Sequence, residues 1–303
     1  MPETAAPSAT SAAASPAAPP LVELHDVHFA YPNGRRVLDG VDIAFGDRRV
    51  GLIGANGSGK TTLLHIIMGL LRPTRGEVRF RGAPLGAEKD FGPLRRAVGF
   101  VFQNADDQLF CPTVIEDVAF GPLNLGRSPA EAAAAASRTL ERLGLGGFEE
   151  RITHRLSGGE KRLVSLATVL AMEPEALLLD EPTNDLDPDT RHRLIGILQD
   201  LPQPFLVISH DWDFLAQVTG EVHCLEAGRL TAQPIARLHG HRHAHPAGDQ
   251  PHHHHPDGEP HNHPGGDAPH QHEAGPAHCH PGGDTPHQHP GADAPAADAA
   301  DRR

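Results

Sequence analysis

One short segment constrains this chain more than any other part of it. Residues 54–62 read GANGSGKTT and fit the phosphate-loop pattern G-x-x-x-x-G-K-[ST]. An apolar run at 50–53 precedes the segment and a helical pattern at 63–70 follows it, which is the strand–loop–helix context that the pattern requires. Such a loop presents backbone N–H groups and the positive end of a helix to phosphate oxygens. The segment therefore predicts a nucleoside-triphosphate site in an α/β fold.

Individual residues of this loop have expected roles. We expect Lys60 to reach the β- and γ-phosphates and the Thr61 hydroxyl to ligate Mg²⁺. The other nucleotide-binding candidates in the loop are Gly54, Asn56, Gly57, Ser58, Gly59 and Thr62. The loop by itself leaves kinases, GTPases, helicases and transport ATPases open.

Two carboxylates follow the apolar run at 176–179. A buried strand would deliver both to the carboxyl edge of the sheet, where ligands bind in open α/β folds. Asp180 is then expected to hold Mg²⁺, and Glu181 to polarise the attacking water as general base. Taken alone, the pair is better explained as an acidic strand end that caps the next segment.

A third motif, Leu-Ser-Gly-Gly-Glu at 156–160, narrows the class. It resembles the L-S-G-G-Q signature of ABC ATPases, with glutamate in the last place. Ser157 and the N–H groups of Gly158 and Gly159 would form a second anion site at a helix N-terminus. A plain capping box explains Ser157 and Glu160 but not two consecutive glycines. In the family that the motif resembles, the signature of one subunit faces the phosphate loop of another, with ATP between them.

The same resemblance implies further site residues. Gln103 is similar to the glutamine that contacts Mg²⁺ and water, and His210 to the switch histidine that senses the γ-phosphate. Asp187 falls in a segment that resembles the D-loop of the dimer interface, and Tyr31 is in the place of the aromatic that stacks on adenine. The expected catalytic residues are Lys60, Gln103, Glu181 and His210. The expected Mg²⁺ ligands are Thr61, Gln103 and Asp180.

The resemblance spans roughly residues 21–230 and is closest to ATPases of the energy-coupling-factor type. The segments that carry this closer resemblance are 98–110, 112–122 and 156–174. It implies ATP and Mg²⁺ as cofactors, a second ATPase subunit (expected to be a copy of this chain), a transmembrane coupling subunit and a membrane-embedded substrate-binding subunit. In that group the substrates are cobalt, nickel or vitamins.

Hydrophobic patterns predict the layers of the fold. Residues 41–45 and 78–80 alternate between apolar and polar, which is typical of half-buried antiparallel strands. Continuous apolar runs, typical of parallel strands buried on both faces, occur at 50–53, 176–179 and 205–208, and 98–102 is a further strand candidate. Capping boxes at Ser128 and Ser157 indicate helices between 104 and 172. We therefore predict an α/β P-loop NTPase core of the ABC ATPase type, with an antiparallel β lobe, an inserted helical signature lobe and disordered ends.

Composition sets the expected boundaries and surroundings. Residues 1–20 are Ala/Pro-rich and residues 239–303 are His-rich and of low complexity, which leaves 21–238 as the nucleotide-binding domain. The net charge of −13 divides into −6 for the last segment and −7 for the rest, so nucleic acid and anionic lipid are poor partners. The first residues have neither the basic nor the apolar region of a signal peptide, so we expect none, and the sequence contains no run of about 20 apolar residues. We expect a peripheral protein on the cytoplasmic face of the membrane, attached through its partners.

The C-terminal segment predicts metal binding. Sixteen of the 23 histidines lie at or beyond His239, many in H-x-H pairs whose two side chains project to one side of an extended chain. Imidazole suits Ni²⁺, Co²⁺ and Zn²⁺, whereas the alternative is a solvated low-complexity tail. The candidate ligands are His261, His263, His270, His272, His278, Cys279, His280, His287 and His289. The expected function is ATP-driven uptake of nickel or cobalt; vitamin uptake and a soluble, non-transport ABC ATPase are the alternatives.

Overall fold

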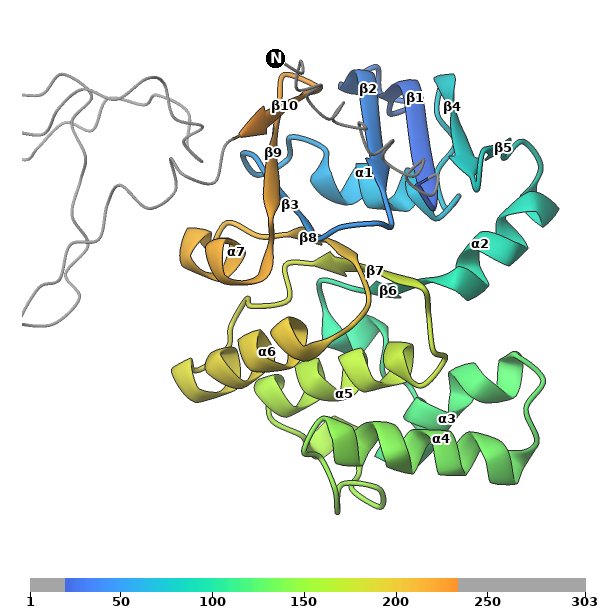
Figure 1. Ribbon diagram of the computed structural model, residues 1–303, viewed down its shortest axis with the longest axis vertical. Helices are drawn as coiled ribbons and strands as arrows, with labels where there is room; N and C mark the ends of the chain where they lie inside the picture. The colour runs from blue at the N-terminus through green and yellow to red at the C-terminus, as the bar shows by residue number, and fades with distance from the viewer. Residues whose placement is uncertain (1–19, 234–303) are drawn as a thin grey trace, which may run out of the picture.

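A computed structural model describes residues 20–233 of the chain, in two sheets with helices around and between them (Figure 1). The predictions for the N-terminal segment and for the His-rich tail, including its candidate metal ligands, lie outside the described residues.

The larger sheet has six strands in the order β10-β9-β3-β8-β7-β6. The strands are β3 (Val50–Ile53), β6 (Val98–Val101), β7 (Ala176–Asp180), β8 (Phe205–Ile208), β9 (Glu221–Glu226) and β10 (Arg229–Gln233). All neighbouring pairs are parallel except β9 and β10. Leu178 packs into one hydrophobic cluster, and Leu177 and Leu179 pack into the other, because side chains alternate between the two faces of a strand. Burial on both faces explains the continuous apolar runs in the sequence, and the predicted parallel strands are confirmed.

The smaller sheet is antiparallel, with strands in the order β2-β1-β4-β5. They are β1 (Val22–Ala30), β2 (Arg36–Phe45), β4 (Arg75–Phe80) and β5 (Ala83–Pro84). Val41 and Phe45 are buried while Asp42 between them is exposed, which confirms the alternation read from the sequence. Helix α1 (Lys60–Ile67) lies between the two sheets, and its leucines and isoleucines join both in one cluster (Figure 1).

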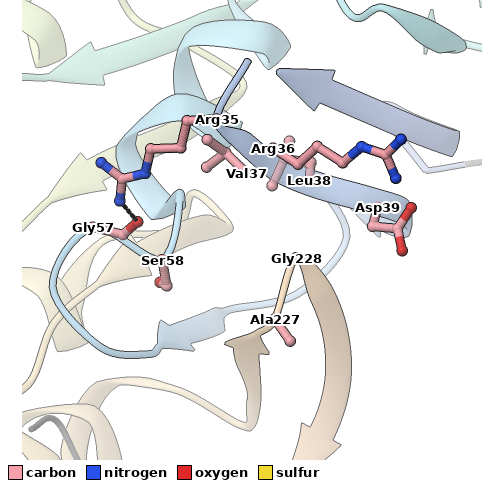
Figure 2. A pocket seen from close by; sticks show the side chains of 9 residues that line it. All are labelled: Arg35, Arg36, Val37, Leu38, Asp39, Gly57, Ser58, Ala227 and Gly228. Atoms are coloured by element: carbon pink, nitrogen blue, oxygen red, sulfur yellow. Dashed lines mark hydrogen bonds between the residues drawn. The ribbon is translucent and has the colours of Figure 1, made fainter. Parts of the chain in front are cut away.

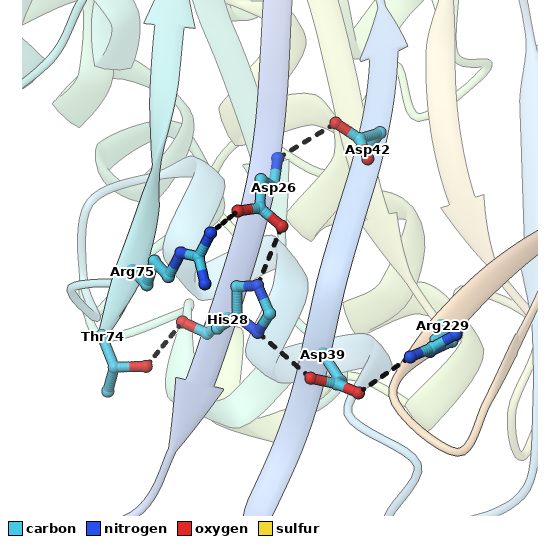
Figure 3. A network of polar contacts seen from close by, with 7 residues as sticks. All are labelled: Asp26, His28, Asp39, Asp42, Thr74, Arg75 and Arg229. Carbon is cyan, nitrogen blue, oxygen red and sulfur yellow. Dashed lines mark hydrogen bonds and ion pairs between the residues drawn. The ribbon is translucent and has the colours of Figure 1, made fainter.

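A polar network ties the antiparallel sheet to the edge of the larger one (Figure 3). The ring of His28 on β1 lies between two carboxylates, with Nε2 at 2.9 Å from Asp26 and Nδ1 at 3.2 Å from Asp39 on β2. Arg75 on β4 pairs with Asp26 at 3.0 Å, and Arg229 on β10 pairs with Asp39 at 3.4 Å. The network therefore connects three strands of one sheet to the outermost strand of the other.

The helical lobe follows β6 and precedes β7, as predicted (Figure 1). Its helices are α3 (Val114–Asn124), α4 (Pro129–Arg142) and α5 (Gly158–Leu170). The remaining helices are α2 (Phe91–Ala97), α6 (Pro188–Asp200) and α7 (Trp212–Val218). Ser128 and Glu131 form the predicted capping box of α4, and Gly144 follows its end with a φ of 67°. Between residues 20 and 233, no helix has the length and apolar character needed to span a bilayer.

Candidate functional site

The phosphate loop joins β3 to α1 and has the geometry of an anion-binding turn. Helix α1 begins at Lys60, earlier than the predicted position 63, because the loop feeds directly into the first helical turn. Gly54, Gly57 and Gly59 have φ values of 149°, 75° and 111°, which residues with a Cβ rarely adopt. A Cβ on Gly54 would lie 2.4 Å from the carbonyl oxygen of Leu225. The glycines therefore allow the loop to turn back against the sheet.

Lys60 lies across this loop. Its Nζ donates to the carbonyl oxygens of Gly54 and Ala55 at 2.8 and 3.1 Å. Burial lowers the pKa of Lys60, and the nearby carboxylates of Glu181 and Asp180 oppose that shift. The ammonium is thus held at the mouth of the loop, facing two negative charges.

Asp180 ends β7 in a buried position, with 1% of its surface exposed. Burial raises the pKa of its carboxyl, although a hydrogen bond from the Thr61 hydroxyl acts in the opposite direction. Among the described residues, Oδ1 of Asp180 has no hydrogen-bond partner. Burying a carboxylate oxygen without a partner costs folding free energy unless a cation binds it. Together with the Thr61 hydroxyl and the Gln103 amide in the same pocket, it gives the oxygen donor set that Mg²⁺ prefers, so these residues fit a magnesium ion.

Glu181 is the next residue and is held in an unusual backbone conformation. Its φ of 47° is in the left-handed region, and its N–H donates to the carbonyl of Ile208 on β8 at 3.0 Å. Its side chain is nearly buried and Oε2 contacts Nδ1 of His210 at 3.0 Å. Two neighbouring strand ends therefore bring the carboxylate and the imidazole together.

These groups share a pocket of about 280 Å³ at the carboxyl edge of the larger sheet. The predicted site residues that line it are Tyr31, Asn56, Gly57, Gly59, Lys60, Thr61, Thr62, Gln103, Asp180 and Glu181. Arg35, Val37 and Ile208 also line it and were missed in the sequence. Gly54 and Ser58 belong to the loop but are not among the lining residues, and His210 reaches the pocket through Glu181. Tyr31 lies between β1 and β2, and its hydroxyl is 2.8 Å from that of Thr62.

The signature segment forms a second helix start, separate from this pocket. Ser157 accepts a hydrogen bond from the N–H of Glu160 at 3.2 Å, and its own N–H donates to the Glu160 carboxylate at 2.8 Å. The first-turn N–H groups of Gly158 and Gly159 have no helical acceptor, as is general for such positions. Glu160 also pairs with Arg151 at 2.8 Å. The predicted capping box is therefore present at the helix end where we predicted an anion site.

The two glycines of the signature have different surroundings, which refines the argument from sequence. A Cβ on Gly159 would lie 2.9 Å from the Thr190 side chain, so this glycine permits packing against α6. A Cβ on Gly158 would meet nothing within 4 Å, so the space around it is open to a ligand. Asp187 caps α6 by accepting from the N–H groups of Asp189 and Thr190 at 3.1 and 3.0 Å. Asp187, the expected D-loop residue, therefore caps the helix turn whose Thr190 packs against Gly159 of the signature.

Comparisons with known proteins identify the family. The sequence profile of the ABC transporter family matches residues 42–184. A protein of Nitratidesulfovibrio vulgaris named as an ABC transporter ATP-binding protein is 56% identical over 238 residues, which cover 78% of this chain and 86% of that protein. The chain is an ABC transporter ATPase. Members of the family hydrolyse ATP, so the predicted enzyme class is confirmed. Solved structures of ABC cassettes superpose on this chain, so the predicted fold is confirmed as well.

Two further matches bear on the type of ABC ATPase. The energy-coupling factor transporter ATP-binding protein EcfA of Methanothermobacter thermautotrophicus is 44% identical over 218 residues, 70% of each chain. The solved structure of CbiO1 from Clostridium perfringens, described as part of the ABC transporter complex CbiONQ, superposes with a TM-score of 0.65 at 32% identity, covering 72% of this chain and 90% of that one. The resemblance to the energy-coupling-factor type is therefore confirmed.

In this ABC ATPase the segment around Gln103 is hydrogen-bonded to the signature helix α5 by contacts that no local pattern predicts. Gln108 accepts from the N–H of Phe102 at 3.1 Å and donates to the carbonyl of Ser165 at 2.8 Å. Arg162 donates to the carbonyl of Phe102 at 2.9 Å. These hydrogen bonds link the segment directly to the helix that carries the signature. No cluster of three or more His, Cys, Asp or Glu side chains suited to a metal ion occurs within residues 20–233.

Proposed function

We propose that this ABC ATPase powers the uptake of a transition-metal ion, nickel or cobalt. The observation that carries the choice of a metal over a vitamin is the series of H-x-H pairs beyond His239. Such a tail next to the cytoplasmic exit of a transporter would bind the arriving ion. The membership in the energy-coupling-factor type supports the wider reading as an importer subunit at the cytoplasmic face of the membrane.

The test is transport by the purified membrane complex. The complex would be reconstituted in vesicles with this subunit, ATP and Mg²⁺, and uptake of radioactive Ni²⁺ and Co²⁺ would be compared with that of a panel of vitamins. ATP-dependent accumulation of either ion supports the proposal. Accumulation of a vitamin without either ion contradicts it.

We assign binding roles within the pocket as follows. Lys60 would bind the β- and γ-phosphates, since its ammonium lies at the loop mouth. Asp180, Thr61 and Gln103 would hold Mg²⁺, which when bound neutralises phosphate charge. Tyr31 would stack on the base from the β1–β2 turn, at the pocket rim. The support is that all five residues line one pocket.

We assign the chemistry to the pair of Glu181 and His210. Glu181 would accept the proton of the attacking water, and His210 would orient its carboxylate through the 3.0 Å contact and meet the γ-phosphate. Because Glu181 is nearly buried and its backbone is fixed by β8, the base would be preorganised.

ABC ATPases act as dimers, and we propose that two copies of this chain pair head to tail. Ser157, Gly158 and Gly159 of one copy would contact the γ-phosphate held by the loop of the other, and Asp187 would cross the interface. The open space around Gly158 and the unpaired N–H groups of the first turn of α5 support this assignment.

An apolar surface in the helical lobe supports a membrane partner. Its exposed large side chains are Phe110, Phe120, Leu123, Leu125 and Ile152. Phe110 is 65% exposed and its ring meets that of Phe120 edge-on, with centroids 4.8 Å apart. Buried Asp117 fixes this arrangement by accepting from the N–H of Phe110 at 3.0 Å. Exposed Asp107 and Glu116 lie in the same segment. We propose that this apolar surface binds a cytoplasmic segment of the transmembrane coupling subunit, one whose apolar side chains are flanked by basic ones.

Replacing both Phe110 and Phe120 with serine should release the ATPase from the membrane complex. The expected result is loss of most of the subunit from the co-purified complex, while the isolated subunit keeps its ATPase activity. Leu70→Ser is the matched control, since Leu70 is 53% exposed but lies outside this surface. Co-purification of the double variant at the wild-type level would contradict the docking surface, as would tight binding of the wild type to protein-free anionic liposomes.

Removing residues 239–303 should strip most Ni²⁺ and Co²⁺ binding from the isolated subunit and leave ATP hydrolysis nearly unchanged. Several pairs on one chain raise the local ligand concentration, so occupancy should exceed that of one pair. Imidazole binds metal when neutral, so the affinity of the full-length protein should fall as the pH drops through about 6.5. Calorimetry across pH measures both, with a deletion of residues 1–20 as the control. Equal metal binding by full-length and truncated protein would refute the tail assignment.

A further inference from the structure

The turn that carries Tyr31 is closed by its own backbone. The N–H of Tyr31 donates to the carbonyl of Arg35 at 2.9 Å, and the N–H of Gly34 donates to the carbonyl of Tyr31 at 2.9 Å. The side chain of Asn33 accepts from the N–H of Arg35 at 3.1 Å. Residues 31–35 therefore form a closed turn in which the backbones of Tyr31 and Arg35 are hydrogen-bonded to each other.

Arg35 fastens this turn to the phosphate loop (Figure 2). Its Nη2 donates to the carbonyl of Gly57 at 2.7 Å. A Cβ on Gly57 would lie 2.9 Å from the same nitrogen, so the guanidinium packs directly on a glycine that has room for it. Figure 2 shows Arg35 bent toward Gly57, whereas Arg36 extends away from the loop toward Asp39.

Arg35 also stands between two hollows. It lines the pocket that holds Lys60, Asp180 and Glu181, and it lines a second hollow of about 200 Å³ between the phosphate loop and the β9–β10 turn. Of the charged side chains along the first pocket, Arg35 and Lys60 are cationic and Asp180 and Glu181 are anionic. The guanidinium is therefore part of the nucleotide pocket and not of a remote surface.

We propose that Arg35 is a clamp that, together with the contact between the Tyr31 and Thr62 hydroxyls, fixes the distance between the base-stacking Tyr31 and the phosphate loop. With the clamp closed, one nucleotide meets the aromatic ring and the loop without reordering either, which removes an entropic cost of binding. Without it, the phosphates still bind and the base loses part of its contribution. Arg35 is thus a positioning residue that acts through Tyr31. This inference rests on the proposed nucleotide site.

The experiment is calorimetric titration of the full-length protein with MgADP, which binds without hydrolysis, and with magnesium tripolyphosphate, which has no base. Arg35→Ala and Arg35→Met should each raise the Kd for MgADP by roughly five- to tenfold, a part of what stacking of one base contributes. Their Kd for tripolyphosphate should stay within about twofold of the wild type. Arg36→Ala is the matched control and should change neither value by more than about twofold.

A second arm tests the route through Tyr31. In a Tyr31→Ala background, Arg35→Ala should change the Kd for MgADP by less than about twofold, because there is no ring left to position. Full additivity of the two substitutions would overturn the clamp, as would equal weakening of tripolyphosphate and MgADP or an unchanged affinity of both Arg35 variants for MgADP. If the wild type itself does not bind MgADP, the nucleotide site is wrong and not merely the clamp.

Discussion

Glu181→Gln is expected to lower ATP turnover by at least about a hundredfold while ATP binding persists, because a positioned general base contributes roughly 10²–10⁴ in rate. Glutamine has the shape of glutamate and can keep the contact with His210, so the pocket should be unchanged. The amide cannot accept the proton of the attacking water. Phosphate release and equilibrium ATP binding measure the two effects separately.

The same variant should accumulate as an ATP-bound dimer, since closure needs nucleotide and opening needs hydrolysis. Size-exclusion chromatography with ATP and Mg²⁺ would show the shift from monomer to dimer. Glu175→Gln is a suitable control because Glu175 lies just before the other end of β7, paired with Arg81 on the surface. Turnover of Glu181→Gln near the wild-type rate would show that another group is the base.

Asp180→Asn should abolish Mg²⁺-dependent hydrolysis and make the ligand-free protein more stable. The Asp180 carboxylate is buried, and burial disfavours its charged form, as the raised pKa shows. The amide carries no charge, so the substitution should remove that cost, about 1–3 kcal/mol. In a domain of this size each kcal/mol raises the unfolding midpoint by about 2–4 °C. Thermal unfolding without nucleotide measures the gain. Asp200→Asn, at the exposed end of α6, should leave both properties unchanged.

The stability difference between wild type and Asp180→Asn should depend on pH with a definite sign. Burial raises the pKa of Asp180 above its ordinary value of 3.8, so over the interval between the two values the folded protein holds a proton that the unfolded chain has released. The wild type therefore loses stability relative to the variant as the pH rises through that interval, and the loss persists above it. A difference that shrinks with rising pH would contradict the assignment.

The sequence predicted those parts of the site that are built from contiguous segments. The loop at 54–62, the carboxylates after β7 and the capping box at Ser157 each depend on neighbours within a few residues, so local patterns reveal them. The buried strands β3, β7 and β8 were equally visible, since burial on both faces leaves an uninterrupted apolar run.

What the sequence did not predict depends on contacts between distant segments. Arg35 meets Gly57, Gln108 meets Ser165, and no period or spacing links either pair. Strand β1 was missed because its register with β2 and β4 shifts near Asp26, whose φ is 47°, so its apolar residues do not alternate regularly. The packing of Gly159 against Thr190 was missed for the same reason, because Thr190 lies on α6, far from Gly159 in the sequence.

Strand β7 has one more consequence. Leu178 is held by the hydrophobic cluster that includes α1, and Leu177 and Leu179 by the cluster that includes the helical lobe, so this strand joins both halves of the domain. If one half opens locally, β7 stays packed against the other half. Its backbone amides should therefore exchange with solvent mainly through global unfolding. We therefore expect the two carboxylates at the end of β7 to lie in a part of the molecule that seldom opens. The signature on α5 and the surface around Phe110 are left as the parts free to shift during a transport cycle.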